Sequence, residues 1–383
     1  LKSTLRVRYS LAFSVGLALS PPRTALYTAS MWQPFVSILV PVRNEGRYIE
    51  RCLYSIARQD YPRSRFEVLV IDGQSTDQTK QIVSRFAAES TIDLRLLQNP
   101  RCKTAAGLNI GLADARGEVI ARIDGHATIA PDFLSRNVDA LFEARPDGRA
   151  DCVGGVIESE GDTYLGRAVA LAMASRFGVG GASFRIGGEG PVDTVAFGAY
   201  RRDVFDRIGG FAEDIDKGED DELNYRLLGH GGTIMLVPGI RARYTVRGTL
   251  GAVWRQYAGY GRAKPEVLRR HPAQARPRQL VPAAFVTALG ASIFAAILGR
   301  TGALKALLLV YTLAATIASL ALVPQHGWRR LPPVPVVFAC LHIAYGYGFL
   351  AGCVGLVGRI LTRTARAGAR PGMEAPNSRA GER

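Results

Sequence analysis

Glu118-Val-Ile-Ala-Arg-Ile-Asp-Gly-His126 joins an apolar run to an acid and an imidazole. The run predicts a buried strand over residues 117–123, so that Asp124 and His126 emerge at its carboxyl end. Open α/β sheets bind their ligands at that edge, and we expect the chemistry there. A carboxylate and an imidazole separated by one glycine suit a divalent cation, whereas Asp-Gly is also an ordinary turn. On these residues alone, both interpretations stay open.

The segments on either side alternate between strand and helix patterns. Short runs rich in Val, Ile, Leu and Phe are typical of buried strands, and apolar residues at helical spacing predict helices. This alternation predicts an α/β fold with a mostly parallel sheet and helices on both faces. The expected strands are residues 35–41, 66–72, 94–97, 117–123 and 152–157, and the expected helices are 45–58, 78–88, 103–113, 133–144 and 164–177.

Three nearly uncharged apolar stretches follow, at residues 280–299, 303–323 and 334–357. Each is long enough, or almost long enough, to cross a bilayer, and three in succession favour membrane segments over buried core helices. The net charge of +15 includes arginines at the borders of these stretches. Arginines there suit an anionic membrane surface and not a nucleic-acid groove, in which basic residues are interleaved with exposed aromatics. Two spans keep the arginine-rich end inside and three place it outside, so both counts stay open.

Four blocks of sequence, in this order, carry a resemblance to a known family. They are Val36-Ser-Ile-Leu-Val-Pro-Val-Arg-Asn-Glu45, Val70-Ile-Asp-Gly-Gln-Ser-Thr-Asp77, Asn109-Ile-Gly-Leu-Ala-Asp-Ala-Arg-Gly117 and Ile123-Asp-Gly-His126. Together they resemble the nucleotide-sugar-binding half of family 2 glycosyltransferases, which have the GT-A fold. The resemblance covers residues 35–264. Within the family the chain is most similar to exopolysaccharide glycosyltransferases of the succinoglycan type, whose metal motif also reads Asp-x-His.

This resemblance divides the chain into five parts. We expect residues 1–34 to be an extension that is not native or is disordered, with Met31 as the start and a signal peptide as the alternative. Residues 35–265 form the GT-A catalytic domain, 266–279 a basic linker, 280–358 the membrane segments and 359–383 a basic, disordered tail. The five cysteines lack CxxC spacing, which indicates neither a disulfide framework nor a zinc site.

The resemblance implies a nucleotide-sugar site formed by the loops that follow the first two expected strands, together with the start of the helix expected over residues 103–113. The loop that contains Pro41, Arg43, Asn44 and Glu45 would hold the uracil and ribose of a UDP-sugar together with Asp72. The alternative for Asp72 is that it caps the following turn.

Two further positions concern the diphosphate. Lys103, beside Arg101, would contact the phosphates or remain a surface charge. Asp124 and His126 would hold Mg²⁺ or Mn²⁺ against them, and the imidazole favours Mn²⁺. The alternatives are that His126 contacts phosphate directly and that the enzyme needs no metal.

A second constellation is Gly218-Glu-Asp-Asp-Glu-Leu-Asn-Tyr-Arg-Leu227. Four consecutive acids are usually a solvated face, but the resemblance aligns Glu219 and Asp220 with the family's Glu-Asp pair. It implies that Asp220 is the general base and that Glu219 orients it or touches the acceptor. An inverting transfer needs such a carboxylate to take the acceptor hydroxyl proton.

The resemblance therefore implies an inverting transferase that moves a sugar, with glucose expected, from a UDP-sugar to a lipid-linked saccharide of a cell-surface polysaccharide. The expected location is the inner (plasma) membrane, crossed more than once, with the catalytic domain in the cytoplasm. No nucleic-acid partner is expected. Two alternatives stay open: a polyprenyl-phosphate sugar transferase, whose phosphate acceptor needs little base catalysis, and a non-catalytic membrane protein that binds nucleotide or saccharide.

Overall fold

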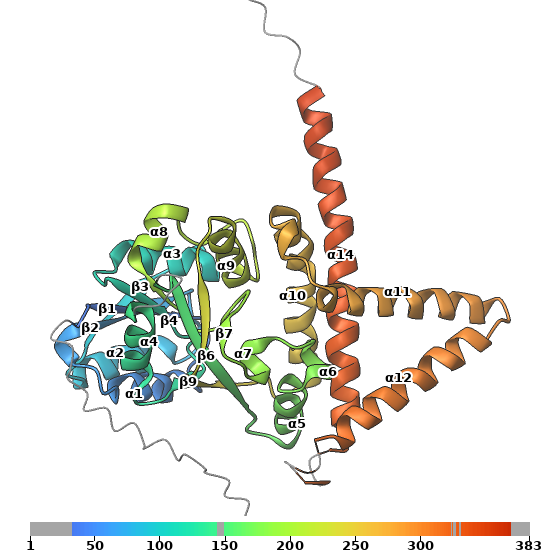
Figure 1. Ribbon diagram of the computed structural model, residues 1–383, viewed down its shortest axis with the longest axis horizontal. Coiled ribbons are helices and arrows are strands. Elements are labelled where there is room, and N and C mark those ends of the chain that lie inside the picture. The colour runs from blue at the N-terminus through green and yellow to red at the C-terminus, as the bar shows by residue number, and fades with distance from the viewer. Residues whose placement is uncertain (1–32, 144–148, 323, 325–326, 329–330, 369–383) are drawn as a thin grey trace, which may run out of the picture. The chain divides into compact units, whose positions relative to one another are not determined.

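The computed structural model describes residues 33–143, 149–322, 324, 327–328 and 331–368 (Figure 1). The chain divides into Leu1–Gln33 and a compact unit, Pro34–Arg383. The expectations for residues 1–32, including the start at Met31, and for the tail beyond residue 368 lie outside the described residues.

Nine described strands form one sheet in the order β3-β2-β1-β4-β8-β6-β9-β5, with β7 paired to β9. The strands β1 to β4 are parallel to one another, which confirms the expected α/β class. The strands are β1 (Val36–Val42), β2 (Phe66–Asp72), β3 (Asp93–Gln98), β4 (Val119–Arg122), β5 (Ala127–Ile129), β6 (Cys152–Glu160), β7 (Gly190–Pro191), β8 (Ala199–Arg201) and β9 (Ile234–Thr245).

The other half of the sheet is mixed, so the expected parallel arrangement holds for β1 to β4 and for the pair β6 and β9, but not for β5, β7 and β8. Strand β8 runs antiparallel to both β4 and β6, while β6 and β9 are parallel to each other. The pattern of apolar residues reports burial and not strand direction, which is why the sequence did not distinguish the two halves.

Alternate residues of the central strands build two cores, one on each face of the sheet. Val36, Ile38 and Val40 of β1 pack on the face covered by α1, α2 and α4. Leu39 packs on the opposite face with α3, α8 and α9. The helices of this region are α1 (Ile49–Ala57), α2 (Thr79–Glu89), α3 (Thr104–Asp114), α4 (Phe133–Phe142), α5 (Tyr164–Met173), α6 (Arg176–Val179), α7 (Ser183–Ile186), α8 (Arg202–Ile208) and α9 (Glu219–Gly229), with a 3₁₀ turn η1 (Arg63–Arg65).

Two expected helices differ most in length from those observed. The helix expected over 45–58 begins at Ile49, because the backbone carbonyl of Glu45 already accepts from the amides of Tyr48 and Ile49 in a preceding turn. The helix expected over 164–177 ends at Met173, since Ser175 caps the separate short helix α6 through its hydroxyl.

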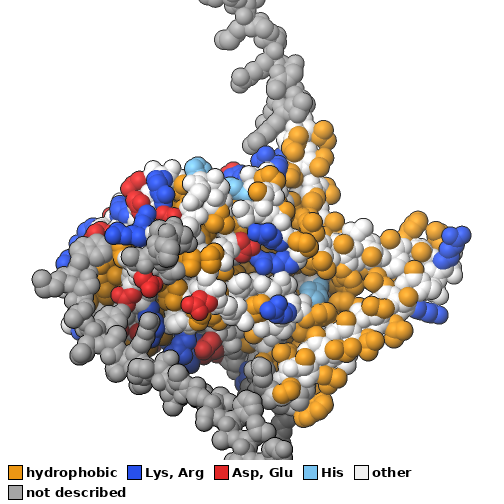
Figure 2. All heavy atoms as spheres, viewed as in Figure 1, with side chains coloured by type: hydrophobic (Ala, Val, Ile, Leu, Met, Phe, Trp, Pro, Cys, Tyr) orange, Lys and Arg blue, Asp and Glu red, His pale blue; other side chains and the backbone are white. Residues whose placement is uncertain are grey.

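The C-terminal part is helical and apolar. It consists of α10 (Leu250–Arg270), η2 (Pro272–Gln274), α11 (Pro277–Ile297), α12 (Gly302–Leu320) and α14 (Val334–Gly368). Three of these helices are long and apolar enough to cross a membrane: Pro277–Ile297, Gly302–Leu320 and Val334–Thr362. Figure 2 shows hydrophobic side chains covering α11 and α12, whereas charged side chains gather over the sheet and its helices.

The segment expected as a basic linker, 266–279, is helical at both ends. Helix α10 continues to Arg270, and Glu266 pairs with Arg269 and Arg270 along its last turn. Helix α11 then begins at Pro277.

Helices α10 and α14 pack closely enough for their backbones to touch. A Cβ on Gly348 would lie 2.1 Å from the carbonyl oxygen of Ala258, and one on Gly261 would lie 2.1 Å from that of Tyr345. Glycine is therefore required on both helices, as in closely packed membrane helices. This contact matters because α10 also forms one wall of the cavity described next.

Candidate active site

A cavity of about 1230 Å³ opens at the carboxyl edge of the parallel strands, where open α/β sheets bind ligands. It extends from the ends of β1 and β4, past the start of α9 and along α10, to α11, α12 and α14. Most of the residues predicted to act in the site line this cavity: Pro41, Arg43, Glu45, Lys103, Asp124, His126, Glu219 and Asp220.

Arg122 joins the two predicted constellations. Its Nε atom lies 3.2 Å from Oδ1 of Asp124, and its terminal nitrogen lies 3.0 Å from Oε1 of Glu219. The Arg122 side chain is only 13% exposed. Burial alone would raise the pKa of Asp124, but the adjacent guanidinium of Arg122 holds that pKa below its ordinary value. A planar guanidinium is suited to bridging two carboxylates in this way.

No role for Arg122 was expected from the sequence. The sequence feature that could have indicated its role is the position of this arginine at the end of a buried strand, two residues before Asp124. A buried arginine needs acidic partners, but their identity depends on the packing of α9 against the sheet.

Asp220 lies in the first turn of α9, after Gly218, which has a left-handed backbone with φ of 79°. Its Oδ1 atom accepts a hydrogen bond of 2.9 Å from the backbone amide of Asp221. Burial and the neighbouring charges of Asp221 and Glu219 raise the pKa of Asp220 to about 7, against the opposing effect of Arg122. A carboxylate with this pKa can accept a proton near neutral pH.

His126 is paired with Glu45. Nδ1 of His126 lies 2.9 Å from Oε1 of Glu45, and the imidazole packs edge-on against Tyr244 with ring centroids 4.9 Å apart. The family resemblance predicts Glu45 beside the nucleotide, and no sequence pattern connects it to His126, which is 81 positions away.

Asn44 and Asp72 are not among the residues that line the cavity. The carboxylate of Asp72 is fully buried and accepts from the backbone amide of Ser75 at 3.1 Å, as in the alternative turn-capping interpretation. Oδ1 of Asn44 accepts from the amide of Thr76 at 2.8 Å. Asp72 thus caps its own turn, whereas Asn44 joins the loop after β1 to the loop after β2.

The two basic residues considered for the diphosphate have acidic partners. Nζ of Lys103 lies 2.8 Å from Oδ1 of Asp216, and Arg101 pairs with Glu213. Lys103 lines the cavity, whereas Arg101 does not. The structure therefore brings Lys103, but not Arg101, to the site.

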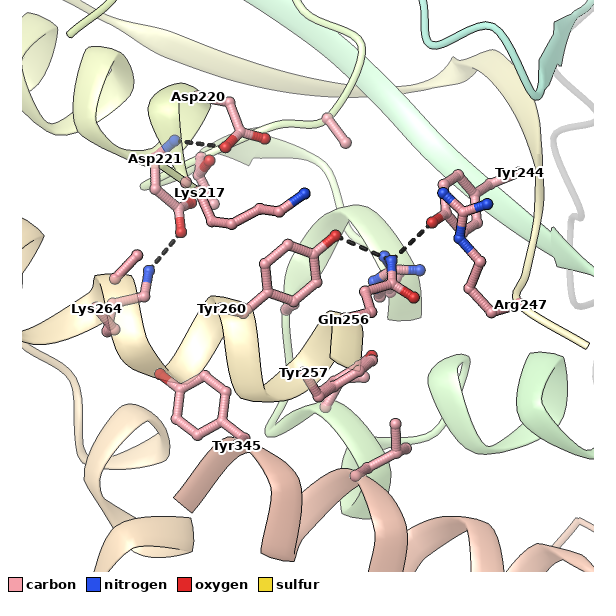
Figure 3. A pocket seen from close by; sticks show the side chains of 18 of the residues that line it. Lys217, Asp220, Asp221, Tyr244, Arg247, Gln256, Tyr257, Tyr260, Lys264 and Tyr345 are labelled. Atoms are coloured by element: carbon pink, nitrogen blue, oxygen red, sulfur yellow. Dashed lines mark hydrogen bonds and ion pairs between the residues drawn. The ribbon is translucent and has the colours of Figure 1, made fainter. Parts of the chain in front are cut away.

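Helix α10 supplies a polar wall that faces α9 (Figure 3). Its Gln256 donates to the hydroxyl groups of Tyr244, at 2.8 Å, and Tyr260, at 3.0 Å. One turn further on, Lys264 pairs with Asp221, the neighbour of Asp220. The i, i+4 spacing of Gln256, Tyr260 and Lys264 places them on one helix face, and this spacing is the signal that could have identified them from the sequence.

No group of three or more His, Cys, Asp or Glu side chains is placed to hold a metal within the described residues. Asp124 and His126 nevertheless fit a cation site whose remaining coordinating groups come from the phosphates of a bound substrate. Nε2 of His126 is buried and has no hydrogen-bond partner in the described part of the chain, and Asp124 lines the same cavity. Cations of Mg²⁺ type are commonly held by one or two protein groups together with substrate phosphates.

Comparison with known proteins identifies the family. The sequence model described as "Glycosyl transferase family 2" matches residues 37–209. The succinoglycan biosynthesis protein ExoA of Rhizobium meliloti is 32% identical over 251 residues, covering 64% of this chain and 74% of that protein. The chain belongs to glycosyl transferase family 2. As a family 2 glycosyltransferase, it is an enzyme.

Two further comparisons extend over most of the chain. A dolichyl N-acetyl-alpha-D-glucosaminyl phosphate 3-beta-D-2,3-diacetamido-2,3-dideoxy-beta-D-glucuronosyltransferase of Methanococcus voltae is 26% identical over 324 residues, covering 84% of this glycosyltransferase and 97% of that protein. The solved mannosyltransferase PcManGT of Pyrobaculum calidifontis, in complex with GDP-Man and Mn²⁺, has a TM-score of 0.57 at 24% identity, covering 82% and 88% of the two chains. The second comparison supports the GT-A fold.

Proposed function

We propose that this family 2 glycosyltransferase transfers a sugar, with glucose expected, from a UDP-sugar to a lipid-linked saccharide, inverting the anomeric configuration. The observation that carries this proposal is the position of Asp220, at the start of α9 in the cavity, joined through Glu219 and Arg122 to Asp124. A proton acceptor thus lies on the same polar network as the residues assigned to the donor diphosphate.

In the proposed reaction, Asp220 takes the proton of the acceptor hydroxyl as that oxygen attacks the anomeric carbon. The new glycosidic bond forms on the face opposite the breaking bond to UDP, so the configuration inverts. Glu219 and Arg122 fix the start of α9 against β4 and hold the base at its position. Preorganised charge of this kind requires little reorganisation during the reaction.

Asp124 and His126 are the residues that would hold Mg²⁺ or Mn²⁺. A bound cation would neutralise the charge that develops on the departing diphosphate. The mannosyltransferase PcManGT, which has the same fold, was solved with Mn²⁺ and GDP-Man, which supports this assignment.

The length of the cavity supports an acceptor that resides in a membrane. From Asp220 the cavity continues past α10 to apolar side chains of α11, α12 and α14, including Phe285, Val310 and Leu341. These three helices are the candidate membrane spans. The name of the Methanococcus voltae relative describes a dolichyl-linked sugar phosphate, and that of the Rhizobium meliloti relative describes succinoglycan synthesis.

We place the catalytic domain on the cytoplasmic side of the inner (plasma) membrane, in exopolysaccharide or cell-surface polysaccharide synthesis. Nucleotide sugars are available on that side, and the arginines that precede the first apolar stretch favour it by the positive-inside tendency.

The experiment is a donor and acceptor panel with the full chain solubilised in detergent. UDP-glucose, UDP-galactose, UDP-N-acetylglucosamine and GDP-mannose are each offered with polyprenyl phosphate or a polyprenyl-diphosphate-linked sugar, with Mg²⁺, Mn²⁺ or EDTA. We expect cation-dependent transfer from UDP-glucose to the lipid-linked sugar, with the opposite anomeric configuration in the product by NMR. Transfer from GDP-mannose alone, or to polyprenyl phosphate alone, would contradict the proposed donor or acceptor.

A further inference from the structure

Glu45 and His126 form a buried pair at the edge of the cavity. Nδ1 of His126 lies 2.9 Å from Oε1 of Glu45, and each side chain is 10% exposed. An ionised carboxylate can only accept hydrogen bonds, so the proton of a neutral imidazole resides on Nδ1. The free electron pair is then on Nε2, the buried atom that has no hydrogen-bond partner in the described part of the chain.

The backbone around Glu45 holds its side chain in place. The amide of Glu45 donates to Oγ1 of Thr79 at 2.8 Å, and its carbonyl accepts from the amide of Ile49 at 2.9 Å. Glu45 is thereby fixed between the start of α2 and the turn that precedes α1.

His126 is held from the other side. Its carbonyl accepts from the amide of Thr245 at 3.3 Å, and its ring packs against Tyr244. Between the two halves of the pair, Gly125 allows close approach: a Cβ there would lie 2.7 Å from Cγ1 of Val42 and 3.4 Å from Cγ of Glu45. The pairing therefore depends on contacts from β1, α2 and β9.

We propose that Glu45 is a positioning residue that fixes the tautomer and ring orientation of His126, so that Nε2 becomes a ligand of a transition-type cation such as Mn²⁺. This rests on the proposed function, in which Asp124 and His126 hold the cation of the nucleotide donor. The assignment differs from direct nucleotide binding by Glu45, because the carboxylate acts here through the imidazole. Metal-bound histidines commonly donate their second ring N–H to a carboxylate, and this partner raises the basicity of the ligand. Imidazole also favours Mn²⁺ over Mg²⁺, which prefers oxygen ligands.

The test uses electron paramagnetic resonance on the full chain in detergent with Mn²⁺ and UDP as probes. Titration gives the dissociation constant of Mn²⁺, and the pulsed spectrum shows whether a ¹⁴N nucleus is bound to it. We expect ¹⁴N coupling in the wild type and its loss in His126→Ala. In Glu45→Gln we expect the dissociation constant to rise by about 10- to 100-fold. In Glu45→Asp, which keeps the charge but shortens the side chain, we expect a smaller rise.

Glu50→Gln is the matched control, because Glu50 lies on α1 nearby but pairs with Arg85 at the surface. Its Mn²⁺ affinity should equal that of the wild type. If both Glu45 variants showed the same ¹⁴N coupling and the same Mn²⁺ dissociation constant as the wild type, the role of Glu45 would be overturned. The cation site of the proposed function would remain intact. Tight Mn²⁺ binding without ¹⁴N coupling in the wild type would exclude His126 as a ligand and also overturn the inference, while leaving glycosyl transfer standing.

Discussion

The guanidinium of Arg122 lies 3.0 Å from the carboxylate of Glu219. This ion pair connects β4, whose end leads to Asp124, with the first turn of α9, which contains Asp220. The two chemical constellations of the sequence, about a hundred residues apart, are thus held together by one buried side chain.

Replacing Arg122 by Met should destabilise the protein by about 3–5 kcal/mol, because it leaves buried carboxylates without their counter-charge. The melting temperature in detergent, followed by tryptophan fluorescence, measures this effect. The double variant Arg122→Met/Glu219→Gln should recover part of the loss, since one of the uncompensated charges is gone. Equal melting temperatures for the wild type and Arg122→Met would contradict the structural role of this pair.

Lys264 should influence the base indirectly. It pairs with Asp221, whose charge is one of those that raise the pKa of Asp220. Lys264→Met would leave Asp221 uncompensated and raise the pKa of Asp220 further. On the acidic side of the pH profile, the pH at which turnover is half-maximal should therefore be higher than in the wild type.

Lys264→Arg is the control for this prediction because it preserves the positive charge, and its pH profile should remain close to that of the wild type. A Lys264→Met profile that coincides with the wild type would show that the charge of Asp221 does not act on the base.

The contact between α10 and α14 should be sensitive to a single methyl group. A Cβ on Gly348 would lie 2.1 Å from the carbonyl oxygen of Ala258, and overpacking of this kind costs about 1–3 kcal/mol. Gly348→Ala should lower the melting temperature and also turnover, because α10 lines the cavity. Gly358→Ala, on the same helix with no atom within 4 Å of the added Cβ, should be tolerated. Equal losses in the two variants would contradict this account.

Asp220 should lower the stability of the metal-free protein as pH rises. An unfolded Asp titrates near pH 3.9, whereas the pKa of Asp220 in the folded protein is raised to about 7. The native state therefore binds more protons between these values, and stability falls as pH increases through that window. Asp220→Asn cannot ionise, so its melting temperature in EDTA should exceed that of the wild type by more at pH 8 than at pH 5. A constant difference at both pH values would indicate an ordinary pKa for this carboxyl.

The parallel half of the sheet was predictable because its strands are short apolar runs separated by helical patterns. Residues 66–72 were expected as a strand, and β2 has these bounds. The mixed half was not predictable in the same way, since strand direction leaves no trace in the spacing of apolar residues. The three apolar helices were also predictable, because long uncharged runs are readily recognised in a sequence.

The candidate site was predictable only where chemistry-bearing residues are close in sequence or belong to a motif of the family. Asp124 and His126 are two residues apart, and Glu219 and Asp220 are adjacent. Arg122, by contrast, gains its role from a helix that begins 97 positions later. Partners of this kind arise from tertiary packing, which local patterns do not encode.

The central claim is that Asp220 is the general base, and the most direct measurement is the turnover of Asp220→Asn with the donor and lipid-linked acceptor found for the wild type. Asp206→Asn, an exposed change of the same chemistry on α8, is the matched control. General-base catalysis contributes about 10²- to 10⁴-fold, so kcat should fall by that factor in Asp220→Asn, with donor binding retained and Asp206→Asn unaffected. Wild-type turnover in Asp220→Asn would contradict the mechanism and favour an acceptor that needs no base.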